Sequence, residues 1–156
     1  MPKILVINGP NLNLLGWREP SVYGPTTLEE LEALIQSDAK QLRMEVVTFQ
    51  SNSEGGIIDF LHKEGFTAQG IIINPGAFGH YSYAIRDAIK SVGTQTIEVH
   101  ISNIYNREEF RHTSVIAAVC EGQITGLGAH GYNMALHWFS RTLAATAKKK
   151  PKSGRR

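Results

Sequence analysis

The sequence predicts an α/β fold in which helices cover both faces of a parallel sheet. Short apolar runs such as Ile4–Ile7 and Ile71–Ile73 do not alternate with polar residues, as expected for strands that are buried on both faces. Between these runs, apolar residues recur at helical spacing. The alternation of strand and helix is typical of right-handed β-α-β units, which build a parallel sheet.

The expected elements follow one another along the chain. We expect strands over residues 3–8, 45–49, 70–74, 94–101 and 122–127. We expect helices over residues 28–42, 54–64, 81–92, 114–120 and 132–147. Thr26 and Glu29 form a capping-box pattern before the first helix, and Pro75-Gly76 ends the third strand. Five strands in a chain of this length favour a flavodoxin-like three-layer sandwich of strand order 2-1-3-4-5.

Length and composition favour a single domain over residues 1–147. The content of 42% hydrophobic and 19% charged residues is ordinary for a globular protein. No apolar run approaches the roughly 20 residues that span a bilayer, and the N-terminus does not resemble a signal peptide. We therefore expect a cytoplasmic protein with no membrane partner. Cys120 is the only cysteine, and we expect it to be a buried apolar residue rather than a reactive thiol.

The positive charge is concentrated at the C-terminus. Six of the sixteen basic residues lie in the last nine positions, so residues 1–147 carry ten basic and fourteen acidic groups, a net of −4. The body is therefore not expected to bind nucleic acid. Residues 148–156 are expected to form a basic disordered tail, for which a nucleic-acid or protein partner stays open as an alternative.

Polar side chains follow three of the expected strands. A loop of about sixteen residues after the first strand is long enough to suggest a functional role. The carboxyl ends of parallel strands meet at one edge of a sheet, so these side chains are expected to converge. The candidates are Asn8, Asn11, Arg18 and Tyr23 after the first strand, Asn74, His80 and Asp87 after the third, and Glu98, His100, Ile101, Ser102, Arg107 and Arg111 from the fourth.

Each candidate alone has a structural explanation. Asn8 and Asn74 could close turns, and a single histidine on a strand, such as His100, is more often a hydrogen-bonded core residue. Their joint occurrence at one sheet edge favours a site.

The inventory of residues also limits the chemistry. No histidine or carboxylate spacing suggests a metal, and no lysine ends a strand, which disfavours imine catalysis. Gly126-Leu-Gly128-Ala-His-Gly131 matches a dinucleotide-binding pattern, but no strand or acidic residue follows at the required distance. We expect these glycines to serve tight turns and close packing, and we expect no cofactor. Acid–base chemistry on an anionic, hydroxylated small molecule remains.

Several motifs in register resemble the type II 3-dehydroquinate dehydratase family over residues 4 to about 145. One departure is Gly79, where the family often has Thr or Ser. The motifs are Asn8-Gly-Pro-Asn-Leu-Asn-Leu-Leu-Gly, Arg18-Glu-Pro-x-x-Tyr23-Gly, Asn74-Pro-Gly-Ala, His80 through Arg86-Asp87-Ala, Glu98-Val-His-Ile-Ser-Asn103 and Arg107-Glu-Glu-Phe-Arg111.

The resemblance implies a lyase of the shikimate pathway of aromatic amino acid biosynthesis. It implies anti elimination of water from 3-dehydroquinate to 3-dehydroshikimate, through an enolate and without a Schiff base. Tyr23 would be the base and His100 the acid, with Glu98 orienting the imidazole. A free tyrosine ionises only near about pH 10, so Arg18 and Arg107 would stabilise the phenolate. Asn11 would help to stabilise the enolate charge.

The resemblance also implies the substrate contacts and the assembly. Asn74, His80, Asp87 and Arg111 would bind the hydroxyl groups, and the backbone N–H groups of Ile101 and Ser102 would bind the carboxylate. The loop over residues 16–24 would act as a lid. The protein would form a homododecamer, a tetramer of trimers, in which Asp87 reaches a neighbouring site.

Two other functions are the alternatives to this enzyme activity: a flavodoxin-like electron carrier and a non-enzymatic scaffold module.

Overall fold

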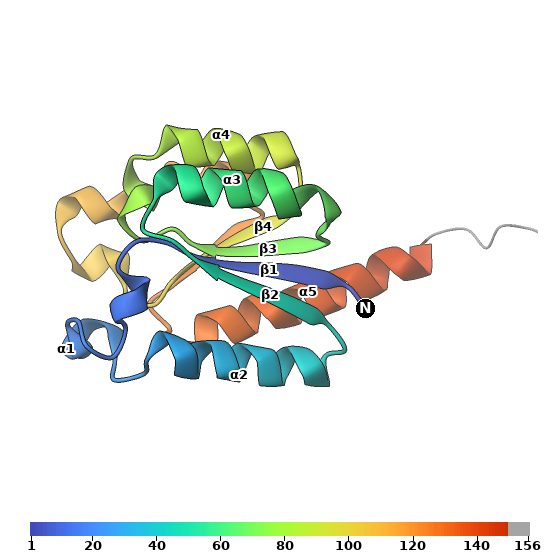
Figure 1. Ribbon diagram of the computed structural model, residues 1–156, viewed down its shortest axis with the longest axis horizontal. Coiled ribbons are helices and arrows are strands. Elements are labelled where there is room, and N and C mark those ends of the chain that lie inside the picture. Colours follow the sequence, from blue (N-terminus) through green and yellow to red (C-terminus); the bar gives the residue numbers. More distant parts are fainter. Residues whose placement is uncertain (150–156) are drawn as a thin grey trace, which may run out of the picture.

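In a computed structural model, which describes residues 1–149, five parallel strands form one sheet of order β2-β1-β3-β4-β5 (Figure 1). This confirms the expected fold class and strand order. The strands are β1 (Lys3–Asn8), β2 (Glu45–Gln50), β3 (Gly70–Asn74), β4 (Thr96–His100) and β5 (Gly122–Thr125).

Helices cover both faces of the sheet and make the expected three layers. In Figure 1, α3 and α4 lie on one face, and α2 and α5 lie on the other. A single-turn helix, α1, lies in the long loop after β1. The bounds are α1 (Pro20–Tyr23), α2 (Leu28–Gln41), α3 (Glu54–Glu64), α4 (Tyr83–Val92) and α5 (His130–Lys149).

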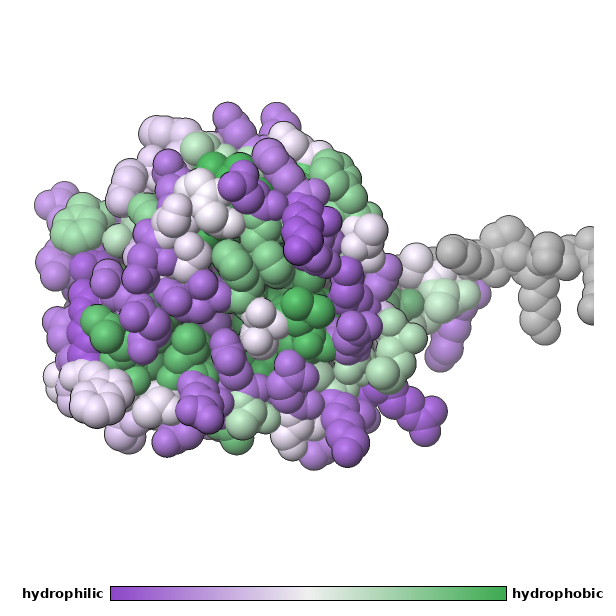
Figure 2. Space-filling view, viewed as in Figure 1, coloured by the Kyte–Doolittle hydropathy of each residue, from purple (hydrophilic) through white to green (hydrophobic). Residues whose placement is uncertain are grey.

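Two hydrophobic cores result from the alternation of side chains along the strands. Ile4 and Val6 of β1 pack in the core that includes α2 and α5, and Leu5 and Ile7 pack in the core that includes α3 and α4. All four side chains are fully buried, which explains the uninterrupted apolar run in the sequence. In Figure 2, apolar side chains are visible between α3 and α2, where the edge strand β2 lies.

The capping-box prediction was one residue out of register. Thr27, not Thr26, caps α2, because its Oγ1 accepts the N–H of Glu30 at 3.2 Å. This register turns Leu31 and Ile35 into the core and leaves Leu34 54% exposed.

Other element boundaries also differ from expectation. Strand β4 is shorter at both ends, and β5 ends at Thr125 because Gly126 turns the chain with a φ of 86°. The segment expected as a helix over 114–120 contains only a three-residue 3-10 turn, Ala117–Val119. Gly131 packs close to the sheet, where a Cβ would lie 3.1 Å from Val99, in line with the close packing expected of the glycine motif.

The C-terminal helix is longer than expected. It begins at His130 and continues to Lys149, so the first two residues of the expected tail are helical. The rest of that tail, residues 150–156, lies outside the described residues. Within residues 1–149, every helix is too short or too polar to cross a membrane.

Candidate active site

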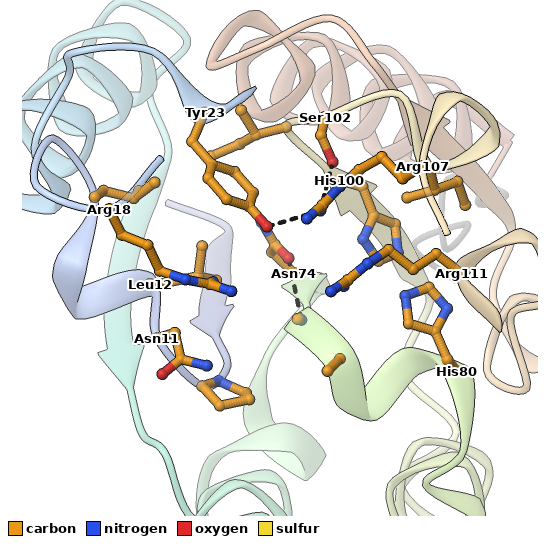
Figure 3. A pocket seen from close by; sticks show the side chains of 16 residues that line it. Asn11, Leu12, Arg18, Tyr23, Asn74, His80, His100, Ser102, Arg107 and Arg111 are labelled. Carbon is orange, nitrogen blue, oxygen red and sulfur yellow. Dashed lines mark hydrogen bonds between the residues drawn. The ribbon is translucent and has the colours of Figure 1, made fainter. Parts of the chain in front are cut away.

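A pocket opens at the carboxyl edge of the sheet, where β1, β3 and β4 end (Figure 3). Ten of the twelve residues named for catalysis, substrate binding and support line it; the other two are Glu98 and Asp87. The ten are Asn11, Arg18, Tyr23, Asn74, His80, His100, Ile101, Ser102, Arg107 and Arg111.

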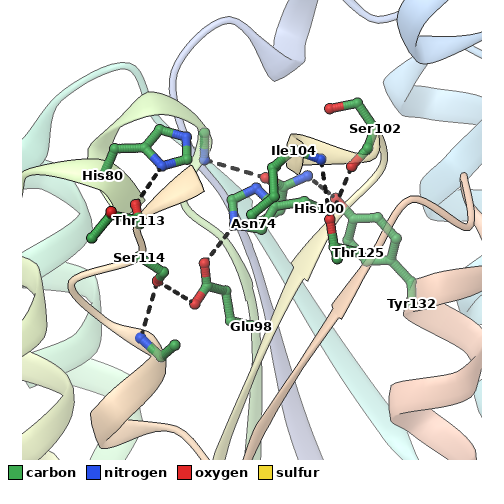
Figure 4. Close-up of polar contacts among 12 residues, drawn as sticks. Asn74, His80, Glu98, His100, Ser102, Ile104, Thr113, Ser114, Thr125 and Tyr132 are labelled. Atoms are coloured by element: carbon green, nitrogen blue, oxygen red, sulfur yellow. Dashed lines mark hydrogen bonds and ion pairs between the residues drawn. The ribbon is translucent and has the colours of Figure 1, made fainter. Parts of the chain in front are cut away.

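Strand β4 supplies a buried histidine–glutamate pair. Residues 98 and 100 lie two positions apart on a strand, so their side chains point to the same face. Glu98 is fully buried, His100 is 6% exposed, and Nε2 of His100 lies 2.5 Å from Oε2 of Glu98 (Figure 4). Glu98 thus lies behind His100 rather than in the pocket lining. This contact fixes the orientation of the imidazole ring.

Two arginines surround the hydroxyl-bearing ring of Tyr23. Arg107 donates a hydrogen bond from Nη1 to the Tyr23 hydroxyl at 2.7 Å, and the same nitrogen lies 3.3 Å from Oγ of Ser102. The guanidinium carbons of Arg107 and Arg18 lie 5.2 and 5.6 Å from the centre of the Tyr23 ring. Figure 3 shows Tyr23 between these two arginines.

A buried network under the pocket orients Asn74. Asn74 donates from Nδ2 to the hydroxyl of Tyr132 at 2.9 Å, and its Oδ1 accepts the N–H of Gly76 at 3.2 Å. The Tyr132 hydroxyl in turn donates to Oδ1 of Asn8 at 2.6 Å. Burial strongly raises the pKa of Tyr132, so its hydroxyl keeps its proton. Asn8 therefore helps to hold the site from beneath.

Sequence reasoning missed Tyr132. It lies on the apolar face of α5, and nothing local in the sequence distinguishes it from a core aromatic residue.

His80 and Arg111 form the opposite side of the pocket. Nδ1 of His80 lies 2.9 Å from the carbonyl oxygen of Thr113, and its ring stacks on His100 with centres 5.9 Å apart. Burial lowers the pKa of His80 below 6.5; His100 and Arg111 act in the same direction, and the Thr113 carbonyl opposes them. His80 is therefore held in the neutral form at neutral pH.

Glu108 holds Arg111, a role that the sequence analysis did not foresee. Nε of Arg111 donates to Oε2 of Glu108 at 2.6 Å. The backbone N–H of Glu108 and this guanidinium lower the pKa of the Glu108 carboxyl.

The loop after β1 carries Asn11, Arg18 and Tyr23 to the pocket. Asn11 has a left-handed backbone, φ 68°, and its N–H donates to Oδ1 of Asn52 at 3.0 Å. Gly16 and Gly24 have φ values of 85° and 82°, so glycines allow the turns on both sides of Arg18 and Tyr23.

Asp87 is not brought to this pocket. It lies on α4 with its side chain 71% exposed, next to Arg86 at 3.4 Å. Cys120 is half-buried and also lies outside the pocket lining. Burial raises the pKa of the Cys120 thiol to about 12, so a thiolate is disfavoured. Among residues 1–149, no cluster of three His, Cys, Asp or Glu side chains could hold a metal ion.

Comparison with known proteins gives a consistent result. The family model described as Dehydroquinase class II matches residues 2–140. A 3-dehydroquinate dehydratase of Roseiflexus castenholzii is 57% identical over 140 residues, covering 90% of this chain and 89% of the relative. A 3-dehydroquinate dehydratase of Bacillus cereus is 59% identical over 136 residues, covering 87% of this chain and 93% of the relative.

Solved structures agree with this. The type II dehydroquinase of Butyrivibrio crossotus superposes with a TM-score of 0.87 at 54% identity, covering 88% of this chain and 97% of that one. The type II dehydroquinase of Propionibacterium acnes gives a TM-score of 0.88 at 44% identity, covering 90% of this chain and 97% of that one.

Proposed function

The chain belongs to the class II dehydroquinase family of hydro-lyases, and we propose that its pocket removes water from 3-dehydroquinate through an enolate intermediate. One observation carries the proposal. Tyr23 reaches the pocket from the loop, between two arginines, and His100 reaches it from the sheet, with Glu98 behind it (Figure 3). A base and an acid on separate walls suit an anti elimination, in which proton and hydroxyl leave from opposite faces.

Tyr23 acts as the base in this mechanism. Its phenolate removes the C2 proton, and the electrons of the C–H bond pass into the neighbouring carbonyl to form the enolate. The hydrogen bond from Arg107 and the charge of Arg18 favour the phenolate over the phenol. Asn11, which also lines the pocket, helps to stabilise the enolate oxygen in this mechanism.

His100 acts as the acid. When the enolate collapses, the C1–O bond breaks, and His100 gives a proton from Nδ1 so that the hydroxyl leaves as water. Glu98 accepts the hydrogen bond of the opposite ring nitrogen and stabilises the imidazolium before the transfer. No lysine lines the pocket, so this route forms no imine.

The remaining pocket residues bind the substrate. Arg111, His80 and Asn74 offer hydrogen bonds to hydroxyl groups, and the backbone N–H groups of Ile101 and Ser102 bind the carboxylate. The segment over residues 16–24 closes over the bound substrate as a lid and carries Arg18 and Tyr23 with it.

We further propose a homododecamer in which Asp87, exposed on α4, completes a neighbouring site. Native mass spectrometry tests the assembly, and a monomeric active enzyme would contradict it. A cytoplasmic location and a biosynthetic role also remain predictions.

An activity assay tests the proposed function. The conjugated enone of 3-dehydroshikimate absorbs ultraviolet light, so its appearance after addition of 3-dehydroquinate reports the reaction directly. Treatment with borohydride in the presence of substrate should leave the enzyme active, because there is no imine to reduce. Absence of product would refute the function, and inactivation by borohydride would refute the non-covalent route.

A further inference from the structure

Ser114 contacts the buried carboxylate behind His100. Its hydroxyl lies 2.7 Å from Oε1 of Glu98, the oxygen that does not face the imidazole. The same Oγ accepts the backbone N–H of Ala117 at 3.1 Å. Figure 4 shows both contacts. Because an ionised carboxylate can only accept, the hydroxyl donates its proton to Glu98.

Glu98 depends on this donor. Among the described residues, its fully buried carboxylate has two side-chain hydrogen-bond partners, Nε2 of His100 and Oγ of Ser114. A buried carboxylate that lacks donors is costly and competes for nearby protons. Gly79 lies next to the carboxylate, since a Cβ at this position would be 3.5 Å from Oε2 of Glu98, but glycine has no side chain that could donate a hydrogen bond to it.

The backbone holds Ser114 in place from both sides. The N–H of Val115 donates to the carbonyl of Gly79 at 2.8 Å, and the carbonyl of Thr113 lies 2.9 Å from Nδ1 of His80. Both contacts tie the segment to the 3-10 turn Gly76–His80, which itself borders the pocket. The serine is therefore part of the wall that carries the acid.

We propose that Ser114 is a positioning residue of the dehydration. Its hydroxyl fixes the Glu98 carboxylate and limits its basicity, so that the proton needed by the leaving hydroxyl stays on His100. The inference rests on the proposed function, since it assigns Ser114 to the acid of that reaction.

A second serine in the same chain makes the same contacts away from the pocket. Ser82 donates to Oε2 of Glu54 at 2.6 Å and accepts the N–H of Ile85 at 3.1 Å. Neither Ser82 nor Glu54 lines the pocket. Ser82→Ala is therefore a control that removes the same kind of hydrogen bond without touching the acid.

The test compares Ser114→Ala, Ser114→Thr and Ser82→Ala by steady-state kinetics across pH. In Ser114→Ala, kcat should fall by about tenfold, the loss of one hydrogen bond to a charged group, with KM nearly unchanged. The basic limb of the kcat–pH profile should move to higher pH, because the more basic carboxylate makes the Glu98–His100 pair retain its proton to higher pH while drawing that proton toward Glu98. Ser114→Thr keeps the hydroxyl and should restore both quantities. Ser82→Ala should lower Tm and leave the profile in place.

Other groups that face the pair are the same in every variant. These are His80 on its stacked side, Arg111 beside His80, and Cys120, whose thiol interacts with the charge of Glu98. A displaced limb therefore reports on the Glu98–His100 pair.

Two outcomes would overturn the inference: a Ser114→Ala enzyme with the wild-type kcat, or one that loses Tm with an unmoved pH profile. If the alanine variant does not fold, Ser114→Cys keeps the shape and weakens the donor, so the same two measurements on that variant decide the question. An inactive wild-type protein would instead refute the proposed function, and the inference with it.

Discussion

The two walls of the pocket are built in different ways. On the strand wall, Asn74, Glu98 and His100 are at most 6% exposed, and each is held by at least one hydrogen bond to a neighbouring side chain. On the loop wall, Asn11 is exposed and Tyr23 is only half-buried. The hydroxyl of Tyr23 has one partner among the described residues, and that partner, Arg107, comes from the opposite wall.

The difference follows from how each wall is supported. Each of β1, β3 and β4 pairs with two neighbouring strands, so ladder hydrogen bonds support the strands that end at the pocket. The first half of the loop contains the buried side chains of Leu12 and Leu15. The second half contains the single-turn helix α1, which has no buried residue and in which Tyr23 packs only partly buried against the core. We infer that the wall bearing the acid is preformed and that the base is delivered to it. Four substitutions or conditions sharpen this contrast.

Tyr23→Phe should have the largest effect. It removes the base from the loop wall, so kcat should fall by about 1000-fold, within the range for general-base removal. The free energy of unfolding should change by less than about 0.5 kcal/mol, since the hydroxyl has a single, partly exposed contact. Steady-state kinetics measure kcat, and urea unfolding measures the free energy of unfolding. Tyr83→Phe, at an exposed tyrosine on α4, is the control. A Tyr23→Phe enzyme with full activity would refute the assignment of Tyr23 as the base.

Arg107→Gln should have the next largest effect, because it breaks the contact between the walls. Loss of a charged hydrogen bond to the Tyr23 hydroxyl should lower kcat by about 10- to 100-fold. Steady-state kinetics measure this loss, and Arg43→Gln, which does not line the pocket, controls for loss of charge. A wild-type kcat in Arg107→Gln would mean that the reaction does not need the contact between the walls.

Tyr132→Phe tests the strand wall alone. It leaves Oδ1 of Asn8 and Nδ2 of Asn74 without their partner in the interior, which should lower the free energy of unfolding by about 1–3 kcal/mol. Substrate affinity should weaken as Asn74 loses its orientation. Urea unfolding and KM measure the two effects, with exposed Tyr105→Phe as the matched control. Wild-type stability would mean that the network does not support this wall.

Acidification should produce the smallest effect, through His80. Because burial lowers its pKa below 6.5, the unfolded chain takes up a proton more readily than the folded protein. The stability contributed by neutral His80 is therefore complete above pH 6.5 and is lost as pH falls through its lowered folded pKa. Compared with His80→Asn, the wild type should lose Tm as pH is lowered from 6.5 toward the lower pKa of His80 in the folded protein. A relative gain of Tm on acidification would reverse the assigned direction.

The sequence predicted the loop wall and the strand wall about equally well, because both consist of local signals. Buried apolar runs place the strand ends, and the residues that follow them must converge. Errors fell on boundaries, such as Thr26 in place of Thr27, where neighbouring hydroxyls compete and core packing decides.

The supports of the strand wall could not be predicted. Tyr132 lies 124 positions from Asn8, and Ser114 lies 16 from Glu98 in a segment that was expected to be a helix. Glu108 resembled an ordinary surface charge until its ion pair with Arg111 was visible. Such contacts depend on tertiary packing and leave no periodic pattern in the chain.

Amide hydrogen exchange measured by mass spectrometry tests the central contrast most directly. Without ligand, amides over residues 16–24 should exchange much faster than those of β3 and β4. In the equilibrium mixture of 3-dehydroquinate and 3-dehydroshikimate, the 16–24 amides should become protected while the strands stay unchanged. A loop as slow as the strands without ligand, or one that stays fast with it, would contradict a preformed acid wall that meets a delivered base.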